Sequence, residues 1–531
     1  MTKKLKFIFD PVFLLVLVLG AGSCLFRLGM ADLDIDESYT ALVAGEHFGQ
    51  IFSSVKAAST PPLYFYLLWG WQTLFGSAPV ALRLLSVSIG LIALTVTYLI
   101  TRSILHQSAA RWSAFLMAIS PLWLFRSRDV RMYSLVALLA LLALAALYRA
   151  FLRNRPRDWI IVTFVLTAGC YTHNVLVFLL PIALLPFGMP RFKERRLASV
   201  SAVFLAIALW LPWLPVILDQ AGSVALQWLV PFWEALPPAL ALPKSLLVLV
   251  PGTAYPIIMR PMPDQAGFII LIPILFVGGA LFYAIRPLAD CRQQTAAKLS
   301  QPEIRWLLIA FLFGPLLLMW GYSISVRPIY LVGRYDIVAL PAFCMLAGWG
   351  ISRWVKSGRP TWLRLRSIIV IVLLGSMWMT TLVPYYQGLK NPRFMRSSLS
   401  ASFLVDKMQP GDALVYQGLR RSRLEYALGR RGFIPSHQSS FPAEIDRHPA
   451  WISIEDMMSR MDDLHHEGLN LSKTLHLYAG AEHRVWIATA GVNPINQLLL
   501  ELLSQRFKID GAMSSPDLGI YCLKPVALKS H

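Results

Sequence analysis

The stretch DLDIDESY, Asp32–Tyr39, follows the first hydrophobic run of the chain and governs how the rest is interpreted. It places four carboxylates within six residues, at the point where the chain is expected to leave a lipid bilayer. Carboxylates are costly near hydrocarbon, and those beside a membrane usually face a cavity, a partner or a substrate. We therefore interpret this stretch as a candidate reactive site.

The composition is that of a polytopic membrane protein. The 531 residues are 56% hydrophobic and only 15% charged, whereas soluble chains carry roughly a quarter charged residues. The net charge of +20 does not indicate nucleic-acid binding, because the basic residues lie in short clusters between apolar runs. The positive-inside rule expects such clusters in cytoplasmic loops. The five cysteines lack metal-site spacing, as does the pair His465 and His466, so no zinc site is predicted.

Apolar runs of about 20 residues, the length that crosses a bilayer, predict the topology. The lysines of Met1–Lys6 predict an uncleaved anchor with its basic end in the cytoplasm. A full crossing at 236–259, which is rich in proline, would place later basic clusters outside, so we expect an outer loop with short or re-entrant helices there. About eleven transmembrane helices result: 7–28, 82–104, 112–125, a run beginning near 133, 159–171, a run after 173, 197–218, 266–285, 305–322, 335–354 and 368–382.

This topology divides the chain into two expected units. Residues 1–384 form the membrane module, with a first outer loop at about 29–80. In that loop the aromatic segment 61–71 is expected to form a helix along the membrane surface. Residues 385–531 are expected to form a small periplasmic or extracellular α/β domain, since helices and strands alternate there. The expected elements are helices near 403–408 and 495–505 and strands at 413–416, 484–488 and 519–523.

Polar residues at the outer ends of the spans fall on one face of the membrane. Carboxylates and arginines gathered there suit a reaction between a phosphate-bearing lipid and a nucleophilic acceptor. A carboxylate can take the acceptor's proton, and guanidinium groups can hold a departing phosphate in bidentate fashion. The outer face has no nucleotide sugars, so an activated donor must be carried by a lipid. The residues concerned are Asp32–Tyr39, Arg128, Asp129, Arg131, His173 and Arg327–Tyr335.

An ordered set of short blocks carries a family resemblance. LDIDESY at 33–39, TPPLYFY at 60–66 and ALRL at 81–84 are followed by RDVRMYSL at 128–135, YTH at 171–173 and GRY at 333–335. The set resembles the C-type glycosyltransferase superfamily, in particular the bacterial branch of the dolichyl-phosphate-mannose protein mannosyltransferases. The resemblance covers about the first 390 residues and implies a membrane-embedded catalytic module with a lipid-linked sugar donor.

The resemblance also implies roles for the matching residues. Asp36 and Glu37 match the Asp-Glu pair of the family's first outer loop, in which the Asp serves as catalytic base. Asp129 matches the acid of the second outer loop, and Arg334 matches the late basic residue that meets the donor phosphate. The candidate catalytic residues are therefore Asp36, Glu37 and Asp129, and the candidate donor-phosphate residues are Arg131, Tyr133, His173 and Arg334.

Two points about the acidic stretch remain open at this level. The pattern Asp34-Ile35-Asp36 mimics a metal-binding DxD sequence, whose oxygens could hold a divalent cation, and no metal ligands are assigned. Asp32 and Asp34 are interpreted as solvated residues where the first span leaves the membrane.

The sequence thus predicts an inverting glycosyltransferase of the bacterial plasma (inner) membrane. It would transfer a sugar from a polyprenyl-phosphate donor to a lipid, glycan or protein acceptor on the outer face. One alternative is a transporter or lipid flippase, although we find no internal repeat of the kind that transporters often carry. Another is a glycan polymerase or ligase, which would favour a pyrophosphate carrier.

Overall fold

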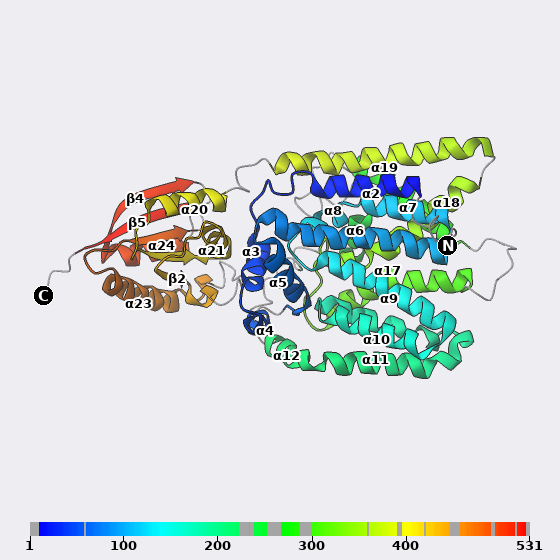
Figure 1. Cartoon of the computed structure of the whole chain (residues 1–531), viewed down its shortest axis with the longest axis horizontal. Helices are drawn as coiled ribbons and strands as arrows, with labels where there is room; N and C mark the ends of the chain where they lie inside the picture. The colour runs from blue at the N-terminus through cyan, green and yellow to red at the C-terminus, as the bar shows by residue number, and fades with distance from the viewer. Residues whose placement is uncertain are drawn as a thin grey trace.

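The protein has a helical part and a part built on a β-sheet, and the helices of the first outer loop lie between the two (Figure 1). The computed structural model describes residues 10–57, 60–221, 233, 238–251, 267–286, 299–357, 360–389, 396–418, 421–446, 457–489, 494–515 and 518–526.

The helical part runs from residue 11 to residue 388. Its helices are α2 (Pro11–Leu25), α3 (Ile35–Ala44), α4 (Phe48–Ala57), α5 (Leu63–Phe75), α6 (Pro79–Ile104), α7 (Gln107–Ala118), α8 (Pro121–Arg128), α9 (Tyr133–Arg153), α10 (Pro156–Cys170), η1 (Asn174–Phe187), η2 (Pro190–Arg195), α11 (Arg196–Trp210), η3 (Leu211–Trp213), α12 (Leu214–Ala221), α14 (Pro238–Leu249), α16 (Gly267–Ile285), α17 (Gln301–Ser325), η6 (Tyr335–Val338), α18 (Leu340–Lys356) and α19 (Pro360–Gly388).

Five helical segments among the described residues are long and apolar enough to cross a membrane, by length and composition. The count of eleven spans stays a prediction. The segment 236–259, expected as a loop with short helices, contains the 12-residue α14, and residues 252–259 lie outside the described ranges. The five segments are Pro79–Ile104, Tyr133–Arg153, Pro190–Asp219, Gln301–Ser325 and Arg364–Gly388.

The segment predicted as one span at 112–125 is instead broken into two helices, α7 and α8. Ser120 lies between them in an extended conformation and accepts a hydrogen bond from the backbone N–H of Trp123. Pro121 follows at the first position of α8, where its missing N–H costs nothing. The prediction of a continuous helix was wrong because hydropathy registers the apolar run but not this start signal.

Helix α18 is the core of the helical part. Every residue from Leu340 to Ser352 is buried, which is typical of a helix that is apolar on all sides. It packs closely against α7, and Gly348 makes that approach possible. A Cβ at Gly348 would lie 2.5 Å from the backbone nitrogen of Ser113 on α7.

The first outer loop contains α3, α4 and α5. The aromatic segment expected to be helical is α5, and its Tyr66 and Trp69 pack against Phe48 of α4 at ring-centroid distances of 4.7 and 5.1 Å. The backbone N–H of Leu63 donates to the carbonyl of Tyr171, which ties the start of α5 to the end of α10. The loop is thus folded onto the end of α10.

The sheet has the strand order β2-β1-β3-β5-β4. Strands β2, β1 and β3 are parallel, and β5 and β4 join as an antiparallel edge. Strands β1, β3 and β5 lie where the sequence predicted them, whereas β2 and β4 lack a comparable apolar signal. The elements are α20 (Arg396–Lys407), β1 (Ala413–Gln417), α21 (Arg421–Gly429), β2 (His437–Phe441), η9 (Ala443–Asp446), α23 (Met461–Ala479), β3 (Val485–Thr489), α24 (Pro494–Ser504), β4 (Phe507–Ser515) and β5 (Leu518–Pro525).

Helices α20 and α21 join this sheet unit to the outer loop (Figure 1). Asp32 accepts hydrogen bonds from both the backbone N–H and the hydroxyl of Ser398, at the start of α20. The hydroxyl of Tyr426 on α21 donates to the carbonyl of Ser77, at 2.6 Å. The interpretation of Asp32 as a solvated residue was therefore wrong, because its carboxylate is a tether between the two parts.

We expect Gly348→Ala to lower the melting temperature of the detergent-purified protein. The added methyl group collides with backbone that cannot rotate away, and overpacking of this kind costs about 1–3 kcal/mol. Gly375→Ala in α19 is the matched control, because nothing lies within 4 Å of a Cβ there. Equal melting temperatures for Gly348→Ala and the unchanged protein would contradict the packing described for α7 and α18.

Candidate active site

Helix α3 begins with a capping box, which fixes the acidic stretch in place. The Asp34 carboxylate accepts from the backbone N–H of Glu37 at 2.7 Å, and the Glu37 carboxylate accepts from the backbone N–H of Asp34 at 3.0 Å. The two side chains thereby satisfy N–H groups that a helix start leaves free. Asp34 is exposed, as expected of a solvated residue, and it also caps the helix.

The Glu37 carboxylate is buried and fully occupied. Besides capping α3, it receives two hydrogen bonds from Arg83 of α6, at 2.9 and 2.7 Å. It also accepts from the backbone N–H of Val130, at 3.0 Å. Glu37 is only 3% exposed. The structure thus makes this side chain a bridge between the first outer loop and the polar segment 126–133, here called the second outer loop, and none of its oxygens faces open space.

Arg83 uses the rest of its guanidinium group to hold the chain that leads into α3. It donates to the backbone carbonyls of Leu28, Ala31 and Asp32, at distances of 2.9, 2.8 and 3.1 Å. Together with the two bonds to Glu37, these contacts employ all five N–H donors of an arginine. The path from the end of α2 to the start of α3 is consequently fixed by one side chain of α6.

Asp36 lies one position before Glu37 and points elsewhere. Its Oδ2 accepts from Nη2 of Arg334 at 3.1 Å, and its side chain is 38% exposed. Burial raises the pKa of Asp36, but the nearby guanidinium groups of Arg131 and Arg334 outweigh this effect and hold the pKa below its usual range. Asp36 is therefore an ionised carboxylate that solvent can reach.

The second outer loop brings Asp129 and Arg131 to the same site. Arg131 donates to the hydroxyl of Thr40, one turn after Asp36 on α3, at 3.0 Å. Asp129 pairs with Arg126 at 2.9 Å. Burial raises the pKa of Asp129 even though Arg126 opposes the rise. The two carboxylates of the site, Asp36 and Asp129, thus have pKa values shifted in opposite directions, a pattern that separates acid and base roles in enzymes.

Arg334 is positioned by the turn that precedes α18. Asp336 accepts from the backbone N–H of Gly333 and, at 2.9 Å, from the hydroxyl of Tyr330. Gly333 has a φ of 81°, a conformation that glycine adopts readily. Its carbonyl accepts from Arg126, at 3.0 Å. The turn is therefore locked to the second outer loop.

Tyr133 and His173 form an aromatic wall beside the arginines. The guanidinium carbons of Arg126 and Arg334 lie 4.9 and 5.9 Å from the centre of the Tyr133 ring, within the range of a cation–π contact. His173 lies 6.1 Å from Tyr133, between ring centres. Its Nδ1 accepts from the backbone N–H of Val175, so in the neutral ring Nε2 carries the proton. Burial, aided by Arg131 and Arg334, lowers the pKa of His173 to about 3.

The predicted site residues thus lie close together, and only one of them, Glu37, points away from the others. Asp36, Arg131, Tyr133, His173 and Arg334 form one cluster with Asp129 at its side, whereas Glu37 turns into the protein. Among the described residues, no group of three or more His, Cys, Asp or Glu side chains is arranged to hold a metal ion. The two acids of the DxD pattern instead serve as a helix cap and as the partner of Arg334.

Comparisons with known proteins identify the architecture. ArnT from Cupriavidus metallidurans bound to undecaprenyl phosphate superposes with a TM-score of 0.56 at 14% identity, covering 96% of this chain and 97% of that one. The apo oligosaccharyltransferase from Archaeoglobus fulgidus gives a TM-score of 0.52 at 11% identity, covering 90% and 69%. Residues 59–217 match the sequence profile of the dolichyl-phosphate-mannose-protein mannosyltransferase family. The chain has the C-type glycosyltransferase fold. No curated protein sequence matches it.

Sequence reasoning missed the side chains that hold this site in shape. Arg83 was visible only as part of a family block, although a charged residue near the end of an apolar span is itself a signal. The D-x-x-E spacing of Asp34 and Glu37 is a capping-box signature. Arg126 and Asp336 carried no signal, because their partners lie in distant segments.

We expect Arg83→Met to destabilise the protein by about 3–5 kcal/mol, because it leaves the buried Glu37 carboxylate without its cation. Adding Glu37→Gln should recover part of the loss, since the second change removes the uncompensated charge. Chemical or thermal unfolding of Arg83→Met, Glu37→Gln and the double variant in detergent tests this coupling. If the double variant were as unstable as the sum of its two single variants, Arg83 and Glu37 would not act as a pair.

Proposed function

We propose that this protein is a glycosyltransferase that moves a sugar from a polyprenyl-phosphate carrier to an acceptor on the outer face of the plasma membrane. The observation that carries the proposal is the pairing of the accessible carboxylate of Asp36 with Arg334, beside Arg131. This arrangement offers a base and two phosphate-binding cations in one place. The undecaprenyl phosphate in the ArnT structure and the dolichol-phosphate in a structure of AglB from Archaeoglobus fulgidus support a lipid-phosphate donor. AglB superposes with a TM-score of 0.50 at 10% identity, covering 90% of this chain and 69% of that one.

The reaction is a single displacement at the anomeric carbon of the donor sugar. The acceptor oxygen forms a bond to this carbon as the bond to the carrier phosphate breaks, and the electron pair leaves on the phosphate oxygen. Asp36 takes the acceptor proton as general base. Arg131 and Arg334 stabilise the charge of the departing phosphate. Attack from the face opposite the leaving group inverts the anomeric configuration.

The ion pair between Asp36 and Arg334 couples donor binding to the strength of the base. A carboxylate whose pKa is held low by an arginine is a weak base. A donor phosphate that draws Arg334 toward itself weakens the hold on Asp36, and the pKa of Asp36 then rises. The base is thus strengthened once a donor is present.

The other candidate residues support these two steps. Glu37 is a positioning residue, because it holds α3 and the second outer loop together through Arg83 and Val130. Asp129 orients Arg126 through their ion pair. Tyr133 supports Arg334, and the neutral His173 offers an Nε2–H donor to the phosphate.

We expect Asp36→Asn to abolish release of polyprenyl phosphate from a labelled polyprenyl-phosphate sugar, because the amide cannot take a proton. Asp462→Asn, an acid at the exposed start of α23, is the matched control and should retain full activity. Donors with a single phosphate should turn over faster than pyrophosphate donors, and the reverse result would favour a polymerase or ligase. Normal turnover by Asp36→Asn would refute the proposed base.

Binding of the product tests the arginines without any need for an acceptor. We expect Arg334→Ala and Arg131→Ala each to weaken binding of undecaprenyl phosphate by tenfold or more, which is about 1.4 kcal/mol. Calorimetry on the purified protein measures this directly, with Lys473→Ala on α23 as the control. Unchanged affinity in both arginine variants would show that the phosphate binds at another site.

The pH profile reports on the ion pair. In Arg334→Gln the loss of the guanidinium group lets the pKa of Asp36 rise, so the base becomes protonated at a higher pH. The acid limb of the residual activity should therefore move to higher pH than in the unchanged protein. The control Lys473→Gln should change neither the rate nor the pH at which the acid limb falls. If this pH were unchanged in Arg334→Gln, the acid limb would not report the protonation of Asp36.

A further inference from the structure

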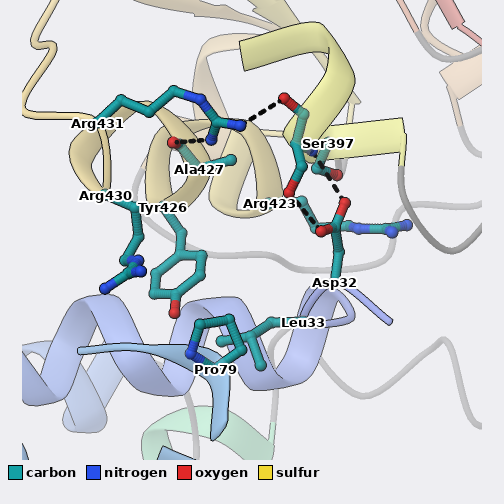
Figure 2. A pocket seen from close by; sticks show the side chains of 10 residues that line it. Asp32, Leu33, Pro79, Ser397, Arg423, Tyr426, Ala427, Arg430 and Arg431 are labelled. Carbon is teal, nitrogen blue, oxygen red and sulfur yellow. Dashed lines mark hydrogen bonds between the residues drawn. The ribbon is translucent and has the colours of Figure 1, made fainter. Parts of the chain in front are cut away.

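A separate pocket of about 390 Å³ lies where the sheet unit meets the outer loop (Figure 2). Its walls come from the start of α3 and α6 on one side and from α20 and α21 on the other. Small-molecule sites typically measure roughly 300–1,000 Å³, so the pocket holds more than a single inorganic anion. It shares no residue with the cluster around Asp36. Its lining includes Asp32, Pro79, Ser397, Arg423, Tyr426 and Arg430.

Two charged side chains of this pocket, Arg431 and Asp32, are hydrogen-bonded to neutral groups of the protein. Arg431 donates to the carbonyls of Ala427 and Ser398, at 2.9 Å each. Asp32 accepts from the backbone N–H and hydroxyl of Ser398, as Figure 2 shows. The lining thus holds three arginines against the single carboxylate of Asp32, which forms no ion pair among the described residues, so its charge is net positive.

Arg423 and Arg430 are the cations that remain. Within the described ranges neither side chain forms a hydrogen bond or an ion pair, and the Nε of Arg423 is a buried donor without an acceptor. A buried donor left unsatisfied costs about 1–3 kcal/mol, so such a group indicates a missing acceptor. Figure 2 shows the Arg430 guanidinium beside the Tyr426 ring and the Arg423 guanidinium on the other side of the pocket, next to Asp32.

We propose that this junction pocket binds a phosphate-bearing headgroup through Arg423 and Arg430. Arginine suits phosphate because its planar donors match the oxygens of the anion. The size of the pocket leaves room for a sugar or glycerol unit beside the phosphate. The site is independent of the proposed sugar transfer and would exist whatever reaction the Asp36 cluster performs.

Occupation of the pocket would strengthen the contact between the two parts of the protein. The hydroxyl of Ser422, next to Arg423, donates to the carbonyl of Ile35, one residue before Asp36. Tyr426 donates to Ser77 across the same junction. A ligand that contacts α21 and the outer loop together would hold α21 against α3.

Binding of soluble and membrane phosphate monoesters to the full-length protein tests this site. In the first arm, calorimetry in detergent measures binding of glucose 6-phosphate. In the second, native mass spectrometry measures the phosphatidic acid retained from nanodiscs of phosphatidylcholine with and without that lipid. Binding in the first arm identifies a soluble or glycan phosphate, and binding in the second arm alone identifies a membrane headgroup.

In whichever arm binds, we expect Arg430→Ala and Arg423→Ala to weaken binding at least tenfold, and the charge reversal Arg430→Glu to abolish it. Lys473→Ala should change nothing. Arg334→Ala also should change nothing, which separates this pocket from the Asp36 cluster and the fate of this proposal from that of the transfer reaction. Binding in neither arm, or binding lost in Arg334→Ala but kept in both pocket variants, would overturn the proposal.

Discussion

The ion pair between Arg83 and Glu37 is the constraint on which the candidate site depends. The pair is buried, and both side chains also form hydrogen bonds to backbone groups. Arg83 gathers the carbonyls that follow α2, while Glu37 caps α3 and holds the backbone beside Asp129 and Arg131. Buried ion pairs often contribute little net stability. The contribution of this one is geometric, since it fixes three segments of the chain at once. The neighbouring carboxylate, Asp36, is left to face the accessible cluster and to pair with Arg334.

The division of labour between neighbouring acids could not be foreseen from sequence. Asp36 and Glu37 are adjacent, yet one faces an accessible cluster and the other the interior. On a helix, successive side chains point about 100° apart, given 3.6 residues per turn, but the sequence does not state which side is the cavity. The order of the family blocks correctly brought Asp36, Arg131 and Arg334 to one face. Their pairing across 298 residues, as between Asp36 and Arg334, required the fold.

Local signals failed in a similar way at two other places. Hydropathy predicted a span at 112–125, whereas Ser120 and Pro121 end one helix and begin another. Asp32 looked like an ordinary solvated acid because its partner, Ser398, lies in a different part of the chain. In both cases, the information lay in short polar contacts rather than in the average character of a segment. Long apolar helices such as α6 and α9, and the apolar strands β1 and β3, were predictable because the average hydropathy of the segment determines them.

The docking of α21 on α3 limits how far the two parts of the protein could evolve as exchangeable modules. The first outer loop, which carries the candidate base, is contacted by Ser422, by Tyr426 and by the start of α20. A sheet unit borrowed from a relative would therefore bring a foreign surface against that loop. Recombination between relatives would succeed only if residues 32–36 and 77 were exchanged together with α20 and α21. We therefore expect the residues on the two sides of this junction to change together in evolution.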